Sequence, residues 1–342
     1  MFIAVLAGFA LLASPMAGIA ASKPAPAAAP VWQENPYPST YKAYPGEPTA
    51  IVGATVFDGA GAEITNGTVL LQGGKVVGVG DARLAVPDGY RRIDGTGKFV
   101  TPGVIDIHSH LGVYASPAVS AHSDGNEATS PTTPQVWAEH SVWPQDPGFS
   151  RALTNGGVTT MQILPGSANL IGGRSVVLKN VYARTAQAMK FPGAPYGMKM
   201  ACGENPKRVD GERKSAPSTR MGNLRGQRTA FLAAEKLRRE WDAWEESQST
   251  GSKGLRKKKR KRQHMGRSHG EGSDSPPARD LDLETLVGVL RGDLLPQLHC
   301  SRADDMLSMM QLAAACAFTI RPFHHALPPS HHSDTLPRPG IA

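Results

Sequence analysis

Residues 49–100 alternate between short runs of β-branched residues and turns rich in glycine and aspartate. Three such runs, AIVGATVFDG, GTVLLQGGKVVGVG and RRIDGTGKFV, have the length and composition of short strands. We therefore predict a small β-sheet or β-sandwich over residues 49–100. It leads directly into an apolar strand that ends in His-Ser-His.

From residue 101 to residue 327 the pattern changes to apolar strands followed by helices. Strands are predicted at 157–164, 196–202, 294–300 and 318–326. Between them, apolar residues recur at helical spacing, and the clearest helix has one apolar face made of Ala230, Ala234, Leu237, Trp241 and Trp244. Alternating strands and helices are typical of a parallel sheet or barrel. We therefore predict an α/β fold at 101–327, built as a parallel sheet or a barrel.

Polar side chains stand at the carboxyl ends of several of these strands. His108 and His110 are two residues apart on a strand, so their imidazoles point to the same side. Glu204, His299 and His324 stand at the ends of later strands. In a (β/α) barrel these ends meet at one face, where catalytic residues collect. Imidazoles that converge on one place suit a metal ion better than core packing, so the pattern predicts a metal site.

The charged residues are unevenly distributed along the chain. The 342 residues are 40% hydrophobic and 19% charged, as in a globular protein, with a formal net charge of +8. Much of the positive charge lies in LRKKKRKRQHMGR, within a Gly/Ser-rich stretch at 249–277. We predict a disordered, low-complexity basic insert at 249–277.

The basic insert also gives an alternative function. Clustered lysine and arginine bind phosphates without sequence preference, so the chain could be a noncatalytic binding protein for nucleic acid or anionic surfaces. Because no aromatic residues are interleaved with the basic ones, we do not expect nucleic acid to be a partner.

Residues 1–21 are apolar and end in the small residues AGIAA. The run is short for a membrane span and offers a cleavage site, so we predict a signal peptide at 1–21 and a Pro/Ala-rich linker at 22–48. This implies a secreted or periplasmic protein without a stable membrane span after cleavage. Since no basic residue precedes Lys23, an uncleaved membrane anchor is the alternative.

Several motifs resemble the amidohydrolase superfamily. TPGVIDIHSHLG resembles the metal-binding signature at the end of the first barrel strand, and residues 49–100 look like the small β-sandwich that precedes the barrel in these enzymes. The motifs GSANLIGGRSVVLK, KMACGENPKR, HCSRADDM and FHHA resemble the imidazolonepropionase-like branch. The resemblance extends from residue 49 to about residue 327, apart from the basic insert. It implies a TIM-like (β/α) barrel at 101–327, of which about six of the usual eight strands are visible.

The resemblance implies one or two divalent metal ions, usually zinc. It also implies hydrolysis of an amide, peptide or cyclic C–N bond, in a small-molecule or peptide substrate, by metal-activated water. His108 and His110 match the ligands of the first strand, His299 matches that of the fifth and His324 that of the sixth, with His325 as the alternative to His324.

Other residues around this set are assigned less directly. A bridging ligand, either a carboxylated lysine or a glutamate, is expected from strand three or four, and we prefer Glu204 to Lys199 because Glu204 stands at the strand end. Arg174 is a candidate for holding an anionic group of the substrate, with a helix-cap or salt-bridge role as the alternative. Cys202 and Cys300 flank the predicted site, and we expect them to be reduced and buried.

Residues 328–342 depart from the family pattern. The sequence PPSHHSDTLPRPGIA contains four prolines, which cannot continue a barrel helix, so we predict an irregular tail. The family's proton-transferring Asp at the end of strand eight has no counterpart, because nothing around Asp334 resembles a strand. We therefore expect an incomplete barrel and little or no hydrolase activity.

Overall fold

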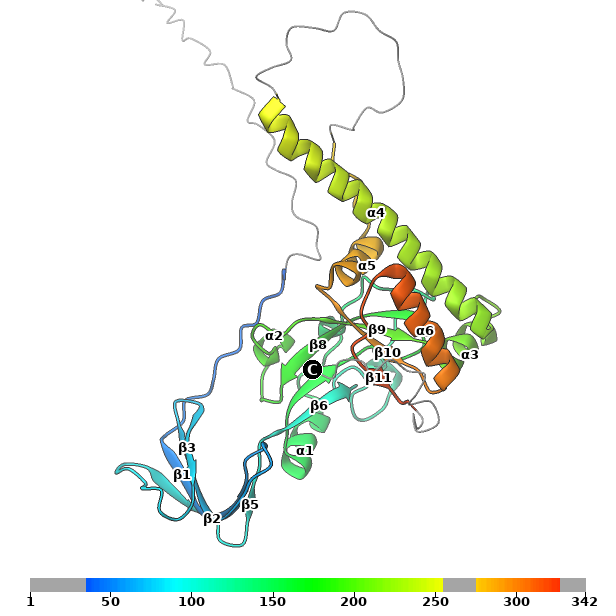
Figure 1. Cartoon of the computed structure of the whole chain (residues 1–342). Coiled ribbons are helices and arrows are strands. Elements are labelled where there is room, and N and C mark those ends of the chain that lie inside the picture. The colour runs from blue at the N-terminus through cyan, green and yellow to red at the C-terminus, as the bar shows by residue number, and fades with distance from the viewer. Residues whose placement is uncertain (1–34, 255–274, 327–342) are drawn as a thin grey trace, which may run out of the picture.

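The computed structural model describes residues 35–254 and 275–326, which form two β-sheets and the helices packed on the larger one (Figure 1). The predicted signal peptide, residues 22–34 of the linker, residues 255–274 of the basic insert and the predicted tail lie outside the described residues. Within the described residues, no helix is both long and apolar enough to cross a membrane.

The smaller sheet contains the strands that the sequence predicts over residues 49–100. It is formed by β1 (Thr49–Phe57), β2 (Glu63–Gln72), β3 (Lys75–Gly80), β4 (Arg91–Asp94) and β5 (Phe99–Val100). Its order is β3-β2-β1-β4, with β5 also on β1; β1, β2 and β3 are antiparallel, whereas β4 and β5 run parallel to β1.

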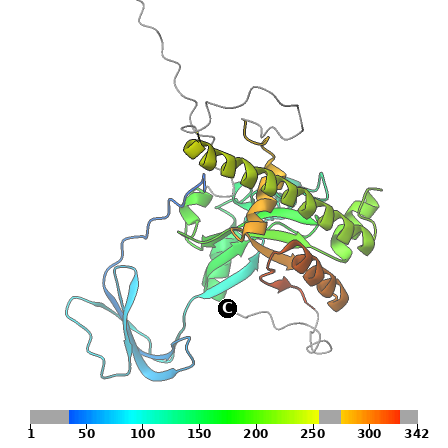
Figure 2. The ribbon, with the colours of Figure 1, turned by 45° about the horizontal axis from the view of Figure 1, so that its top comes forward.

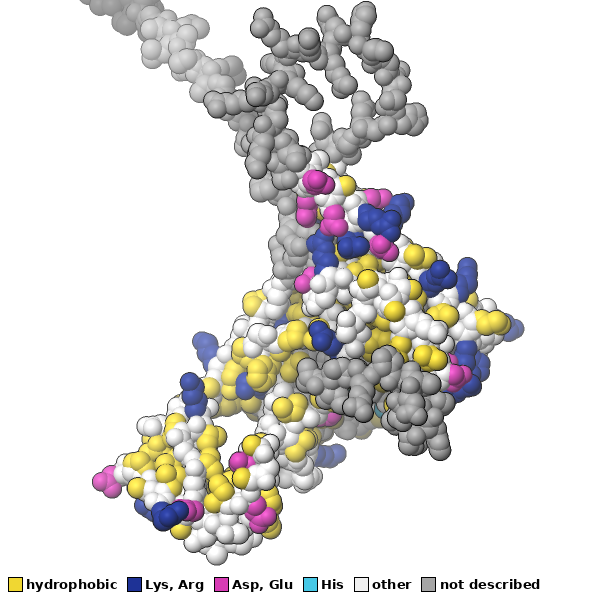
Figure 3. Space-filling view, viewed as in Figure 1, with side chains coloured by type: hydrophobic (Ala, Val, Ile, Leu, Met, Phe, Trp, Pro, Cys, Tyr) yellow, Lys and Arg dark blue, Asp and Glu magenta, His cyan; other side chains and the backbone are white. Residues whose placement is uncertain are grey.

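The predicted second layer of a sandwich is not confirmed, because the described strands of this region join a single sheet. Ala54, Val56 and Val69 form its small core, whereas Val76 and Phe99 are exposed. Hydrophobic side chains accordingly gather on the surface of this sheet (Figure 3).

The larger sheet carries the strands in chain order across a curved surface. It comprises β6 (Val104–Ser109), β7 (Val158–Ile163), β8 (Ile171–Lys179), β9 (Gly197–Ala201), β10 (Leu295–His299) and β11 (Phe323–His324), in the order β11-β10-β9-β8-β7-β6. The two edge strands approach each other, since the ring centroids of His108 on β6 and His324 on β11 are 4.4 Å apart. The result is a mixed α/β fold with a nearly closed, barrel-like sheet of six strands.

One strand departs from the predicted parallel arrangement. β8 is antiparallel to both β7 and β9, whereas β6–β7 and β9–β10–β11 pair in parallel. The connection at 164–170 is too short for the crossover that a parallel neighbour requires, so the chain turns back directly from β7 into β8. A regular (β/α) repeat is therefore wrong at this point.

Helices pack along the outer face of the larger sheet (Figures 1 and 2). They are α1 (Pro147–Gly156), α2 (Ala186–Met189), α3 (Glu204–Glu212), α4 (Arg220–Gly254), α5 (Leu281–Arg291) and α6 (Ala303–Cys316), with 3-10 turns η2 (Ser120–His122) and η3 (Ala138–His140) in the loop after β6. The predicted apolar face of α4 is confirmed: Ala234, Leu237 and Trp241 are buried against β9, β10, α5 and α6. Because α4 continues to Gly254, the first residues of the predicted disordered insert are helical instead.

Candidate functional site

Five histidines and one lysine meet at the carboxyl ends of the strands of the larger sheet. Nε2 of His108 lies 3.2 Å from Nε2 of His110 and 3.4 Å from Nζ of Lys199. The ring of His108 also contacts the ring of His324 at 4.4 Å between centroids. His299 is connected to the other rings by His325. The ring centroid of His325 is 4.7 Å from that of His299 and 4.7 Å from that of His108. We call His108, His110, Lys199, His299, His324 and His325 the histidine cluster.

The cluster brings together residues that are far apart in the sequence, as the spacing of His108 and His110 and the strand-end positions of His299 and His324 predicted. Lys199 points to the same side because β9 alternates: Met198 and Met200 pack into the outer core with α4, so the residues between them face the interior. His110 is oriented by its Nδ1, which lies 2.8 Å from the backbone oxygen of Leu164 after β7.

Burial and crowding of like charges favour neutral side chains in the cluster. Burial, with the neighbouring Lys199, lowers the pKa of His108 to about 2, and burial lowers the pKa of His324 and of His299 to about 4. Burial also lowers the pKa of Lys199 to about 7. Each histidine therefore keeps a free nitrogen lone pair at neutral pH, which is the form that binds metal.

The donor set suits a metal ion, although the side chains are not in coordination geometry. Two nitrogens on one tetrahedral zinc lie about 3.3 Å apart, because each Zn–N bond is about 2.0–2.1 Å, and His108 and His110 match this separation at 3.2 Å. Buried ring nitrogens of His108 and His324 also lack a hydrogen-bond partner. Nevertheless, the rings of His108 and His324 meet edge to face, and within the described residues no three His, Cys, Asp or Glu side chains are placed to hold an ion.

Glu204 lies outside the cluster, which corrects the preference for it over Lys199. Its exposed carboxylate pairs with Lys207 at 3.0 Å, and this partner lowers its pKa. The chain turns away after β9 at Gly203, whose φ of +76° favours glycine, so Glu204 begins α3 with its side chain in solvent. Lys199 takes its place as the candidate bridging residue.

Asn205, the next residue of α3, faces the cluster instead. Its amide nitrogen donates a hydrogen bond to Oγ of Ser167 at 2.7 Å and lies 3.3 Å from Nε2 of His299. Sequence reasoning missed Asn205, although it directly follows the Gly-Glu pair at the strand end. A polar residue in the first turn after a strand is the signal that could have found it.

Arg174 is buried on the outer side of β8, not beside the histidines. Its guanidinium stacks 4.1 Å from the ring centroid of Trp137, and one of its nitrogens donates to Oγ1 of Thr285 on α5. The neighbouring Ser175 instead faces the interior and accepts a hydrogen bond from Gln162. The structure thus gives Arg174 a packing role and corrects the substrate-binding hypothesis.

Cys202 and Cys300 form a disulfide, so the expectation of reduced thiols is wrong. Their Cα atoms are 5.3 Å apart, and the bond joins residues separated by 98 positions. Each cysteine directly follows a strand that carries a cluster residue: Cys202 follows β9 and Cys300 follows His299 at the end of β10. The disulfide therefore ties together the strand ends that hold Lys199 and His299. Cys316 is free and buried.

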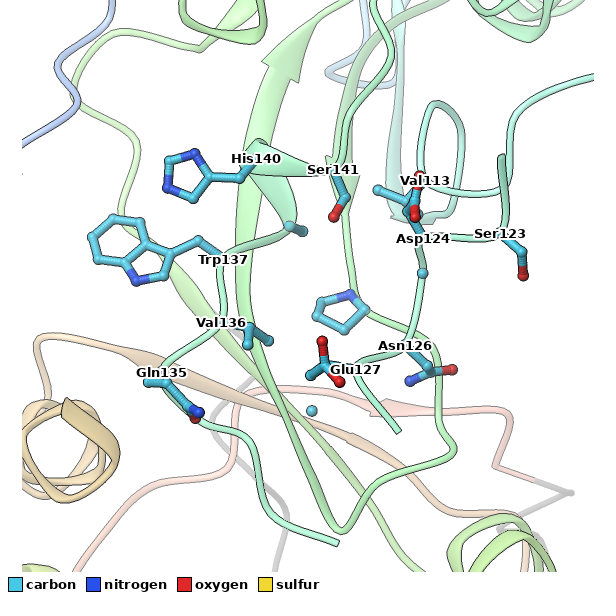
Figure 4. A pocket seen from close by; sticks show the side chains of 14 residues that line it. Val113, Ser123, Asp124, Asn126, Glu127, Gln135, Val136, Trp137, His140 and Ser141 are labelled. Carbon is cyan, nitrogen blue, oxygen red and sulfur yellow. The ribbon is translucent and has the colours of Figure 1, made fainter. Parts of the chain in front are cut away.

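A cavity of about 370 Å³ lies beside the cluster instead of inside it. It is lined mainly by segments 123–127 and 135–141 of the loop after β6 (Figure 4). A second cavity of about 250 Å³ is lined by His110, Tyr114, Asn126 and Asn205, among others. Asn126 lines both cavities, so they adjoin, and the smaller one contacts the cluster directly.

We expect the metal-free chain to lose stability as the pH falls from about 6.5 to about 4.5. The folded pKa values of His108, His299 and His324 are lowered, so the unfolded state binds more protons in this window and the free energy of unfolding falls with pH. A loss of more than about 1 kcal/mol is expected, measured by urea denaturation with EDTA at both pH values. The substitution His324→Gln should reduce this loss of stability, and His122→Gln should not. If the free energy of unfolding depends on pH equally in the wild type and in His324→Gln, the prediction is wrong.

Comparison with known proteins places this geometry in context. The chain is 35% identical over 272 residues to Amidohydrolase tasK from Hapsidospora irregularis, a match that covers 76% of this chain and 26% of that protein. Among solved structures it resembles an amidohydrolase from Thermotoga maritima, with a TM-score of 0.63 and 36% identity, over 80% of this chain and 63% of that one. The chain therefore spans less than two thirds of the length of either relative. No protein-family model matches it.

Proposed function

We propose, because this chain belongs to the amidohydrolase superfamily, that it forms part of a hydrolase that cleaves C–N bonds with the help of a divalent metal. The observation that carries the proposal is the histidine cluster, in which side chains from β6, β9, β10 and β11 converge at one end of the sheet.

The residues that would hold the metal are His108, His110, Lys199, His299 and His324. When bound, such an ion would polarise the carbonyl of the substrate and activate water for attack on it. A backbone hydrogen bond already orients one of these residues. The carbonyl of Leu164 accepts the Nδ1 proton of His110, which leaves Nε2 of His110 free to act as a ligand.

Lys199 is the bridging candidate of this proposal. Its side chain is fully buried, and burial lowers its pKa to about 7, so a substantial fraction of the amine is neutral at physiological pH. A neutral amine is the form that can add carbon dioxide, releasing one proton, to give the carboxylated lysine that the family resemblance implies. His325 stays the alternative to His324, because both rings contact His108.

Substitution of the two bridging candidates distinguishes them. We expect Lys199→Ala to lower metal affinity by about 10- to 100-fold and Glu204→Gln to leave it unchanged, because only Lys199 faces the histidines. Bound zinc is measured by elemental analysis after dialysis against a series of zinc concentrations. Normal zinc binding by Lys199→Ala together with loss in Glu204→Gln would restore the assignment to Glu204.

Hydrolysis is tested on a panel of dipeptides, N-acyl amino acids and cyclic amides. Each is assayed with zinc, manganese or cobalt and again after treatment with EDTA. We expect release of amine that depends on metal but is slow compared with the median enzyme turnover of about 10 s⁻¹. Turnover that survives removal of the metal would contradict the proposal.

The alternative function, binding of nucleic acid or anionic surfaces, depends on the basic insert. Residues 255–274, which hold most of its charge, lie outside the described residues. Since no contact or surface of the described residues favours this alternative, we do not propose it.

A further inference from the structure

One side of α3 lines a cavity of about 250 Å³ that contacts the histidine cluster. Asn205, Arg208 and Val209 are spaced as i, i+3 and i+4 on this helix, and all three line the cavity. His110 of the cluster also lines it. A molecule in this cavity would therefore contact both the cluster and α3.

The permanent charge in the lining of this cavity is positive. In the part of the chain that the structure describes, its lining holds a single permanently charged side chain, Arg208, and no carboxylate. The nearest acid to Arg208 is Glu212, whose Oε1 lies 3.6 Å from Nη1, and both side chains are more than half exposed, at 53% and 67%. Exposed pairs of this kind contribute little, so Glu212 does not prevent Arg208 from binding an anion.

The remaining walls are neutral and fixed by hydrogen bonds. The hydroxyl of Tyr114 donates to Oδ1 of Asn126 at 2.9 Å, and Asn205 donates to Ser167 at 2.7 Å. Gly166 packs against Tyr114 and Asn126, because a Cβ there would lie 2.1 Å from Oδ1 of Asn126 and 2.8 Å from the Tyr114 hydroxyl. The cavity is thus formed before a ligand binds, which reduces the entropy cost of binding.

We propose, building on the hydrolase function above, that this cavity holds the carboxylate of the substrate and that Arg208 selects it. The substrate class is then a small N-acyl amino acid or dipeptide with a free carboxylate. The guanidinium can bind both carboxylate oxygens, which a neutral amide cannot match. The cavity is below the range of about 300–1,000 Å³ that is usual for drug-sized ligands, so it favours a group of amino-acid size.

Binding of two matched probes to the full chain tests this proposal. N-acetyl-L-alanine carries the carboxylate, and N-acetyl-L-alaninamide has almost the same shape without the charge. We expect isothermal titration calorimetry to give an affinity at least about tenfold higher for the acid. Arg208→Gln should abolish this preference and Arg208→Lys should keep part of it.

Lys207→Gln is the matched control, because it removes the adjacent positive charge from α3 at a residue that pairs with Glu204 and does not line the cavity. It should leave the preference for the acid intact, and circular dichroism verifies that each variant is folded. Equal affinity of the two probes for the wild type, or a preference that survives in Arg208→Gln, would overturn the proposal. Because the readout is binding, loss of hydrolysis with a retained preference would count against the hydrolase function alone.

Discussion

The double substitution His108→Ala/His110→Ala is expected to reduce bound divalent metal to roughly a tenth of the wild-type amount or less. Two of the five residues proposed to hold the metal are removed together, and single losses among supporting residues already cost about 10- to 100-fold in affinity. The nitrogens of these residues are the pair that lies at the separation of two zinc ligands, 3.2 Å. Elemental analysis of the purified chain, after dialysis against a small excess of zinc, gives the metal content.

The matched control replaces two histidines that lie outside the cluster. His122 contacts Trp143, and His140 contacts Tyr37 and Trp137, all in or near the loop after β6 or the N-terminal segment. His122→Ala/His140→Ala removes the same number of imidazoles and should retain the wild-type metal content. If the two double variants bind the same amount of zinc, the cluster is not a metal site.

The sequence predicted the parts of this site that follow from strand and helix periodicity. His108 and His110 share a face because side chains alternate along β6, and His299 and His324 meet them because each stands at a strand end. The apolar face of α4 follows equally directly from its spacing, and Trp241 is buried as expected. These predictions need only local geometry and the tendency of strand ends to gather at one edge.

The choice between Lys199 and Glu204 could not be made in the same way. All five residues of β9 are buried, so hydrophobic patterning does not reveal which set of alternating residues faces the interior. The position of Glu204 depends on a turn at Gly203 with positive φ, which is a property of the backbone and not of the pattern. The same ambiguity applies to Arg174, because β8 is buried along most of its length on both faces.

The orientation of β8 and the pairing of the cysteines depend on the arrangement of strands. The apolar composition of β8 does not show in which direction the strand runs relative to its neighbours. Its antiparallel pairing with β7 follows from the short connection between the two strands. Cys202 and Cys300 meet because β9 and β10 pair with Ala201 opposite His299, which places the next residue of each strand side by side. Neither the neighbour relation nor the register is encoded in the spacing of the cysteines.

We expect the double substitution Cys202→Ala/Cys300→Ala to lower the free energy of unfolding by about 2–4 kcal/mol. The disulfide closes a loop between residues 98 positions apart, and its loss restores conformational freedom mainly to the unfolded chain. Because the strand ends that it joins carry Lys199 and His299, the variant should also bind metal more weakly than the wild type. Urea denaturation under non-reducing conditions measures the stability, and zinc titration measures the second effect.

Cys316→Ala is the control for this prediction, because Cys316 is buried but free. It should lose stability on addition of dithiothreitol as the wild type does, whereas the double variant should be insensitive to the reductant. A wild type whose stability does not change with dithiothreitol would show that the two cysteines are not bonded in solution. In that case their proximity at the ends of β9 and β10 would reflect packing alone, and the strand ends beside His299 would be held only by backbone contacts such as the hydrogen bond from Cys202 to the carbonyl of His299.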